Sequence, residues 1–381
     1  MKTSTHRILT THVGSLPRSA EVTEAVFGCE RGEVLSEGEF DRIIGGAVRD
    51  VVQRQHAVRV DLVSDGEQSK ISYATYIKDR LTGFDGDSAR VPPADLVDYP
   101  SFLKRQASSG GTPTYRRPRC VGPVAVKSMQ PLMDDIATFR RALEGVPVTE
   151  SFMNAASPGV IALFQPNDYY PSHEKYIEAL AEAMRPEYEA IIAAGFLLQI
   201  DSPDLGLGGH TLFKGRPVEE YRRLATLHVG VLNHALRNCP ADRMRLHMCW
   251  GNYEGPHHHD LPMDIVLPIA LQAKPQALLF EASNPRHAHE WTVFRDANIP
   301  DEKILVPGVI DSVTNFIEHP LLVAERIEKF ANIVGRERVI AGTDCGFSTF
   351  AGFGAVDAAI VYAKLATMAE GARLASQRLW S

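Results

Sequence analysis

Four residues of the types that ligate metal ions in proteins lie at or just after short apolar runs in the second half of the chain. His247 and Cys249 form a His-x-Cys pair at the end of one predicted strand. Glu281 ends the next such run, and Cys345 follows a third through the turn 342–344. Side chains two residues apart on a strand point the same way, so this imidazole and thiolate can converge on one ion. Two sulfur ligands, one nitrogen and one oxygen suit Zn²⁺, whose catalytic sites keep a position open.

The alternative interpretation is a core histidine and separate buried cysteines, because a lone His-x-Cys pair arises easily by chance. The placement of all four residues at strand ends favours a shared metal site. A bound zinc would favour deprotonation of a substrate thiol and hold its sulfur as a thiolate, which implies alkyl transfer to sulfur. A metal-bound hydroxide used for hydrolysis is the competing chemistry.

Other predicted strands also end in polar side chains that could serve the same site. They include the segments 12–15, 65–67 and 201–203, and Asp311. The His-rich run 257–260 is flanked by Gly-Pro and Leu-Pro pairs and predicts a loop. Consecutive residues on a regular element do not all face one ion, so we expect this loop to line the mouth of the site.

The elements that must position these residues are short strands alternating with amphipathic helices. The predicted strands are 8–13, 59–64, 120–126, 149–155, 196–200, 244–248, 277–280, 304–309 and 339–341. The predicted helices are 40–58, with Ser36 as a cap, 174–194, 218–237, 322–334 and 355–379. Such alternation predicts an α/β fold in which helices cover parallel strands.

Eight strands can form a barrel if 120–126 is an accessory strand. The sequence therefore favours a (β/α)₈ TIM barrel with insertions, and a doubly wound sheet is the alternative. We expect residues 1–381 to form a single barrel domain. The segment 85–119 is rich in Pro, Ser, Gly and Arg and predicts an insertion or long loop. In such a barrel the chemistry lies in the loops that follow the strands.

The composition argues against several classes of protein. Of the 381 residues, 44% are hydrophobic and 23% are charged, which is ordinary for a globular chain. The net charge of −7, without a concentrated run of Lys and Arg, argues against a nucleic-acid partner. No stretch reads as a signal peptide or a membrane span, so we expect a cytoplasmic protein without a membrane partner. The sequence leaves a homo-oligomer open.

The cysteines point away from a disulfide framework. There are five, an odd number at irregular positions, and thiols stay reduced in the cytoplasm. Cys29, Cys120 and Cys239 have no partners at metal-binding spacing, so we interpret them as structural.

Several of these motifs, in this order along the chain, resemble those of the catalytic domain of cobalamin-independent methionine synthase. The matching motifs run from near residue 10 to near residue 350, so the resemblance covers most of the chain. It is closest to the short, single-domain branch, and epoxyalkane:coenzyme M transferase is a related member. The motifs are Thr10-Thr11-His12-Val13-Gly14-Ser15, Asp65-Gly66-Glu67, Gln199-Ile200-Asp201-Ser202-Pro203, Leu246-His247-Met248-Cys249, Phe280-Glu281-Ala282-Ser283, Pro307-Gly308-Val309-Ile310-Asp311 and Asp344-Cys345-Gly346.

The resemblance implies a (β/α)₈ barrel with a zinc ion and a bound amino-acid thiol. The implied zinc ligands are His247, Cys249, Glu281 and Cys345. The positions implied to hold the amino-acid part of homocysteine are Gly14, Ser15, Glu67 and Asp201. Residue chemistry agrees, because carboxylates pair with ammonium groups and turn amides bind carboxylates. Arg119, in Arg119-Cys120-Val121, resembles a folate-side motif and is a further candidate for substrate binding.

The chain departs from the family pattern around the alkyl donor. The family's catalytic histidine aligns with Val313, so we expect the leaving-group proton to come from His319 or from the 257–259 loop, with His258 as its candidate. The tryptophan against which folate packs is absent from the segment 156–165. The interval between Cys249 and Glu281 also includes the His-rich loop, which we expect to reshape the pocket. These departures affect the donor and leave the thiol chemistry intact.

The leading hypothesis is a zinc-dependent methyl or alkyl transfer to a small thiol such as homocysteine, with a methyl-folate among the candidate donors. Opening of an epoxide by a coenzyme M thiolate is the nearest alternative. A metal-free lyase of the uroporphyrinogen decarboxylase type is a different class on a similar barrel, and stoichiometric metal would argue against it. A non-enzymatic thiol- or metal-binding protein is the last alternative, which turnover of any alkyl donor would exclude.

Overall fold

The structure is a computed structural model that describes all residues except 34–35, 37, 90–91 and 109–115. Eight parallel strands form one sheet in the order β1-β10-β9-β8-β7-β6-β5-β2. Their bounds are β1 (Leu9–Thr10), β2 (Leu62–Ser64), β5 (Glu150–Ala156), β6 (Leu197–Asp201), β7 (Met244–His247), β8 (Ala277–Phe280), β9 (Ile304–Ile310) and β10 (Ile340–Thr343).

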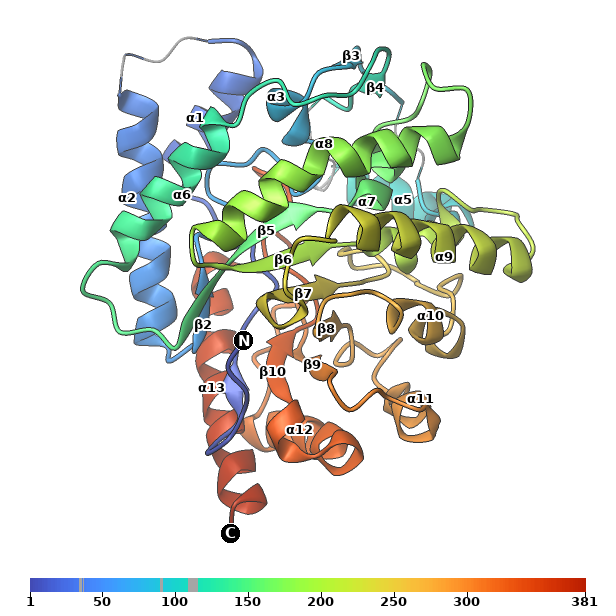
Figure 1. Cartoon of the computed structure of the whole chain (residues 1–381). Helices are drawn as coiled ribbons and strands as arrows, with labels where there is room; N and C mark the ends of the chain where they lie inside the picture. Colours follow the sequence, from blue (N-terminus) through green and yellow to red (C-terminus); the bar gives the residue numbers. More distant parts are fainter. Residues whose placement is uncertain (34–35, 37, 90–91, 109–115) are drawn as a thin grey trace.

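The two edges of this sheet meet, so the sheet is a nearly closed barrel (Figure 1). The amide of Asp61, just before β2, donates to the carbonyl oxygen of Thr10 in β1 at 3.1 Å. The hydroxyl of Thr11 donates to the carbonyl oxygen of Leu62 at 3.3 Å. The prediction of a (β/α)₈ TIM barrel is therefore confirmed, and an open doubly wound sheet is excluded.

Helices surround the barrel (Figure 1). The longer ones are α1 (Ala20–Glu30), α2 (Glu39–Ala57), α6 (Gln130–Leu143), α8 (His173–Ala193), α9 (Val218–Ala235), α10 (Met263–Ala270), α12 (Pro320–Val334) and α13 (Ala358–Leu379). Shorter ones are α3 (Ile77–Arg80), α4 (Ala94–Val97), α5 (Pro100–Ser108), α7 (Pro158–Phe164) and α11 (Trp291–Asp296). The five predicted helices correspond to α2, α8, α9, α12 and α13. Among the described residues, no helix is long and apolar enough to cross a membrane.

Helix α2 illustrates both the strength and the limit of local signals. Its apolar residues recur at helical spacing and are buried against the barrel, as the pattern predicts. The predicted cap at Ser36 is wrong: the N-cap is Gly38, in the left-handed conformation at φ 76°. The Ser36 hydroxyl instead donates to a carboxylate oxygen of Glu39 at 2.6 Å.

Strand alternation divides the core into two layers. One set of side chains fills the barrel interior, and the alternate set packs between strands and helices. In β6, Leu197 points inward and Leu198 outward; in β8, Leu279 points inward and Phe280 outward. Every second side chain along a strand points the same way as these inward residues. Asp201, four positions after Leu197, and Glu281, two positions after Leu279, therefore also point inward. The pleat that builds the core therefore also aims these polar side chains at the barrel mouth.

The segment predicted as an insertion or long loop, 85–119, lies outside the barrel sheet. Its ends pair as a short antiparallel ribbon of β3 (Phe84–Asp85) and β4 (Arg119–Cys120). The predicted strand 120–126 shares only Cys120 with this ribbon, so it is accessory to the barrel, as expected. Between the two strands lie α4 and α5. We call residues 92–106 the roof segment, because their side chains cover one of the cavities described below.

Candidate metal centre and active site

The ends of β7 and β10 bring three of the four predicted metal ligands together, and the end of β8 places the fourth, Glu281, beside Cys345. His247 is the last residue of β7, Cys249 follows it by two, and Cys345 follows β10 by two. Ligand atoms of these three buried side chains all lie within 4.8 Å of one another. Glu281, the residue after β8, places Oε1 3.8 Å from the Cys345 sulfur. The Nε2 atom of His247 is also 3.8 Å from this sulfur.

Neighbouring groups orient the imidazole and the carboxylate of this cluster. Asp201 Oδ1 lies 3.3 Å from His247 Nδ1, which leaves Nε2 facing the sulfur atoms. A carboxylate behind a histidine is the usual arrangement at a metal site, because it fixes the tautomer and raises ligand basicity. Both oxygens of Glu281 accept hydrogen bonds, from the Trp250 amide at 2.8 Å and the Asn284 side chain at 2.7 Å.

The electrostatics of the cluster fit a bound cation. Burial, followed by the neighbouring Cys249 thiol, raises the pKa of Cys345 well above its ordinary value. Burial also raises the pKa of Glu281 to about 7, with the charge of His287 opposing it and that of Asp344 adding to it. Two thiolates and a carboxylate this close and this buried repel one another unless a positive ion lies between them. The S₂NO donor set is one that Zn²⁺ accepts.

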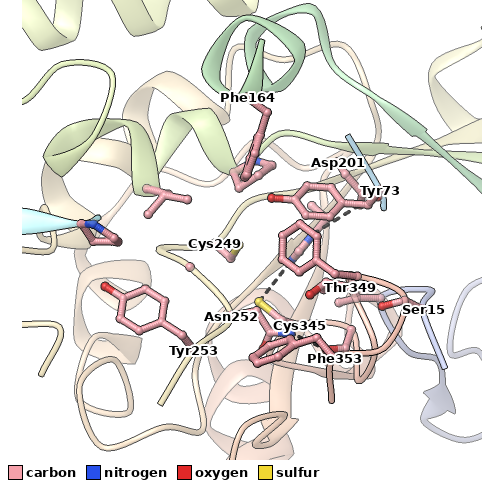
Figure 2. A pocket seen from close by; sticks show the side chains of 18 of the residues that line it. Ser15, Tyr73, Phe164, Asp201, Cys249, Asn252, Tyr253, Cys345, Thr349 and Phe353 are labelled. Carbon is pink, nitrogen blue, oxygen red and sulfur yellow. Dashed lines mark hydrogen bonds and ion pairs between the residues drawn. The ribbon is translucent and has the colours of Figure 1, made fainter. Parts of the chain in front are cut away.

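A cavity of about 400 Å³ opens onto this cluster (Figure 2). At its inner end lie Cys249 and Cys345 with Ser15, Glu67 and Asp201. The other end is formed by aromatic and aliphatic side chains and by the roof segment. These residues include Tyr73, Phe164, Phe350, Phe353, Tyr253, Pro92, Pro93, Leu96 and Leu103. The cavity therefore has a polar end that holds sulfur and carboxylate groups, and an apolar end suited to a flat or hydrophobic molecule.

The turn after β1 is shaped by a close approach to Asn154. Gly14 adopts φ 146°, and a Cβ atom there would lie 2.4 Å from the Asn154 amide oxygen, so only glycine fits. The Asn154 amide donates to the carbonyl oxygen of Val13 at 2.9 Å and to Asp201 at 2.8 Å. Gly14 thus shapes the cavity wall, while its neighbours Val13 and Ser15 line it.

Glu67 is held in an unusual backbone conformation at the polar end of the cavity. Its φ is 55°, a strained value for a residue with a side chain, and it is buried. Lys70 Nζ is 3.7 Å from Oε1, which has no hydrogen-bond partner among the described residues. Burial raises the pKa of Glu67 to about 7; Lys70 opposes the shift and Asp201 adds to it. An unsatisfied buried carboxylate oxygen of this kind is a ready acceptor for a ligand's ammonium group.

A second cavity, of about 430 Å³, is also lined by Cys345. It shares Cys345, Asn252 and Tyr253 with the first cavity. Val313 lines this second cavity and offers no proton. The Cys345 side chain therefore borders both cavities.

His257 is a candidate functional residue that the sequence interpretation did not single out. It lines the second cavity with Glu281 and Cys345, at a strained φ of 52°. Its Nδ1 lies 2.8 Å from Asp260, and its Nε2 lies 2.9 Å from the carbonyl oxygen of Tyr253. Burial works to lower the pKa of His257, but the hydrogen bond and charge of Asp260 outweigh it and raise the pKa to about 9. His257 is thus an imidazolium at neutral pH.

Three predicted residues are not brought into the site. His319 is the exposed N-cap of α12 and accepts a hydrogen bond from the Leu321 amide. His258 is exposed and contacts Asp98. Arg119 forms a half-exposed ion pair with Asp168. None of these three side chains lines either cavity.

Arg117, two residues before Arg119, does line the first cavity. Its guanidinium lies 5.5 Å from the centre of the Phe164 ring and donates to the carbonyl oxygen of Phe164 at 3.4 Å. Arg119 lies in strand β4 of the ribbon, whereas Arg117 precedes that strand. No sequence signal distinguishes them, because the direction of the ribbon is set by tertiary contacts.

Fold and site together define a (β/α)₈ barrel with a cluster of candidate metal ligands at its strand ends, where barrel enzymes carry their active sites. A family profile described as "Cobalamin-independent synthase, Catalytic domain" matches residues 8–90 and 160–373. The chain therefore belongs to this family, and the resemblance inferred from the motifs is confirmed. The matched ranges include Ser15, Glu67, Asp201 and the four candidate ligands but exclude the roof segment.

Curated relatives and a solved structure agree with this family. The chain is 24% identical over 377 residues to a methionine synthase of Saccharolobus solfataricus, covering 97% of this chain and 95% of that protein. It is 26% identical to a 5-methyltetrahydropteroyltriglutamate–homocysteine methyltransferase of Chelativorans sp., with 89% of this chain covering 39% of the relative. A B12-independent methionine synthase from Shewanella sp., solved with selenomethionine, shares the fold at TM-score 0.75 and 19% identity, covering 98% of this chain and 99% of that one.

Proposed function

We propose that this protein is a zinc-dependent S-methyltransferase that methylates homocysteine or a closely related amino-acid thiol. Methyl transfer of the methionine synthase kind follows from the family and from the relatives named above. The observation that carries the zinc-thiol mechanism is the convergence of His247, Cys249 and Cys345 in the cavity that Glu67 also lines.

The four candidate ligands would hold the metal, and the chain supplies the rest of the chemistry. When bound by His247, Cys249, Glu281 and Cys345, zinc lowers the pKa of a substrate thiol and keeps its sulfur nucleophilic. Asp201 keeps the His247 ring oriented through Nδ1. The Trp250 amide and Asn284 hold the Glu281 carboxylate in place.

The polar end of the cavity suits the amino-acid part of the thiol. The Oε1 atom of Glu67, which has no hydrogen-bond partner among the described residues, would bind the ammonium group of homocysteine together with Asp201. The turn at Gly14 and Ser15 would bind its carboxylate through backbone amides and the Ser15 hydroxyl. These contacts would fix the thiol with its sulfur beside the Cys249 and Cys345 side chains.

The apolar end of the cavity suits a methyltetrahydropteroyl donor such as those named for the relatives. Tyr73, Phe164 and Phe350 contact one another as tilted or edge-on rings with centroids 5.6–6.4 Å apart. Such rings offer faces and edges to a flat heterocycle, which the missing tryptophan does in the family pattern. Arg117, above Phe164, would pair with a glutamyl carboxylate of the donor.

We propose that His257, rather than His258 or His319, protonates the leaving group. The thiolate sulfur attacks the methyl carbon in line, the carbon–sulfur bond forms, and the bond to the donor nitrogen breaks. That nitrogen takes the electron pair and then a proton from Nε2 of His257, which Asp260 keeps charged. In the structure, Nε2 of His257 contacts the carbonyl oxygen of Tyr253, a residue that lines both cavities.

Activity with a matrix of thiols and donors on zinc-loaded protein tests this function. We expect methionine from homocysteine and a 5-methyltetrahydropteroylglutamate, with loss of the activity on zinc chelation and recovery on adding zinc back. Turnover only with epoxides and coenzyme M would support the alkyltransferase alternative instead. Methyl transfer that survives complete removal of zinc would contradict the proposed zinc dependence. We assign the enzyme to the cytoplasm, where Cys249 and Cys345 stay reduced.

A further inference from the structure

A second group of metal-binding side chains lies outside the active site, on the exposed rim of the roof segment. Asp98 follows α4, and His258 and His259 lie in the loop after β7. The Nε2 atoms of the two histidines are 2.9 and 2.7 Å from the same oxygen of Asp98. Their side chains are 35% and 43% exposed, and that of Asp98 is 48% exposed. None of the three lines either cavity.

The geometry of this group is close to that of three ligands around one ion. The three ligand atoms lie within 4.8 Å of one another. Two atoms bound tetrahedrally to a zinc ion at about 2.0–2.1 Å lie roughly 3.3 Å apart. The observed contacts would thus open by about half an ångström around an ion. Exposed side chains move this far without disturbing the backbone, and water can fill the remaining positions.

The charge and chemistry of the ligands define which ions fit. The Asp98 carboxylate is half-exposed and one of its oxygens already meets both imidazole nitrogens, so it is available as a ligand. Two imidazoles and one carboxylate favour late first-row divalent ions such as Zn²⁺, Ni²⁺ and Cu²⁺ over Mg²⁺ or Ca²⁺. The absence of a thiolate distinguishes this group from the cluster of Cys249 and Cys345.

The position of the group gives it a mechanical consequence. Directly beneath it, the buried Asp95 of α4 accepts hydrogen bonds from the hydroxyl of Tyr253 at 2.8 Å and from the backbone amide of His257 at 2.9 Å. The roof segment is therefore already attached to the loop after β7 by a buried contact. We propose that Asp98, His258 and His259 form a second, exposed divalent-metal site that fastens the roof segment to this loop over the cavity.

Titration of zinc-loaded enzyme with Ni²⁺ tests the site. Wild-type protein is expected to bind one Ni²⁺ beyond its zinc content. Asp98→Asn and His259→Gln should each weaken that binding by at least about tenfold. His234→Gln is the matched control, because His234 is an exposed histidine paired with Glu182 alone. Binding of Ni²⁺ that is equally tight in wild type, Asp98→Asn and His259→Gln would overturn the site.

A second probe reports the ligands themselves. With Cu²⁺ at one equivalent, electron paramagnetic resonance should show coupling to two imidazole nitrogens in wild type and one in His259→Gln. The same coupling in both proteins would overturn the assignment of His259 as a ligand.

Hydrogen exchange tests the fastening role separately from binding. Ni²⁺ is expected to slow exchange of the backbone amides of residues 101–106 in wild type and to leave them unchanged in Asp98→Asn. Tight Ni²⁺ binding without any slowing would overturn the fastening role. None of these readouts depends on turnover, so the result stands apart from the proposed methyltransferase function.

Discussion

The inner end of the active cavity and the roof segment that covers its outer end are built in different ways. At the inner end, the polar side chains lie on barrel strands or in the turns that follow them, as His247 and Glu281 do. The roof segment is attached by side-chain hydrogen bonds such as those of Asp95, and it lies outside the ranges that match the family. The comparison indicates that the barrel strands position the candidate metal ligands, whereas the roof segment lies outside the ranges that match the family profile.

The largest effect should come from removing a sulfur ligand at the inner end. Cys345→Ala should lower zinc affinity by more than about 100-fold, because even the outer partners of metal ligands cost 10- to 100-fold when lost. Zinc content after dialysis and methyl transfer to homocysteine measure the loss. Cys239→Ala is the matched control, since Cys239 is buried but far from any metal cluster among the described residues. Full zinc retention by purified Cys345→Ala would contradict the metal centre.

The next largest effect concerns the proton donor, where the two regions meet. His257→Asn keeps a residue that tolerates the left-handed backbone and should lower kcat by about 10²- to 10⁴-fold. Because the pKa of His257 is raised to about 9, its acid form is present below that pH and lost above it. The wild-type rate should therefore fall above about pH 9, and the rate of the variant should not show this fall. A rate lost in His258→Asn but retained in His257→Asn would show that the sequence-based candidate is the acid.

A smaller effect is expected at the ammonium site. Glu67→Gln should weaken binding of methionine, which has no thiol to titrate, by about 10- to 100-fold, the equivalent of one lost charge-assisted contact. Wild-type affinity should rise with pH through about 7 as the Glu67 carboxylate ionises, and the affinity of the variant should not. Isothermal titration across pH 5–9 measures both. Identical pH profiles for wild type and Glu67→Gln would count against this role.

The same variant has a consequence for stability. Burial raises the pKa of Glu67 from 4.5 to about 7, so the native state binds more protons than the unfolded state between these values. This group therefore makes the wild-type protein less stable as pH rises from 4.5 to 7. Glu67→Gln should flatten that part of the profile of unfolding free energy against pH, measured by urea denaturation. A steeper profile in the variant would reverse the sign argued here.

The smallest effect should come from loosening the roof segment. Asp95→Asn removes the negative charge of the carboxylate that accepts hydrogen bonds from the Tyr253 hydroxyl and the His257 amide. This variant should raise the KM for the methyl donor by about fivefold, equivalent to about 1 kcal/mol. Zinc content and methionine affinity should stay unchanged, because the inner end is built from the strands. An equal loss of zinc or methionine binding would mean that the two regions are not separable.

The two regions also differ in how far the sequence could predict them. The convergence of the candidate ligands was predictable because strand alternation is local: Leu279 points into the barrel, so Glu281, two positions later, points the same way. The ribbon that exposes Arg119 and the positive φ of His257 were not predictable, because both depend on contacts distant in sequence. His257 and His258 are adjacent, yet one lines a cavity and the other faces outward, and no local pattern separates them.

The central claim is that homocysteine binds through its sulfur to a zinc ion held by this chain. X-ray absorption at the zinc edge measures this directly in the purified enzyme. The resting spectrum should fit two sulfur ligands with nitrogen and oxygen, and addition of homocysteine should add one sulfur to the first shell. A zinc first shell that stays unchanged at saturating homocysteine would contradict the mechanism.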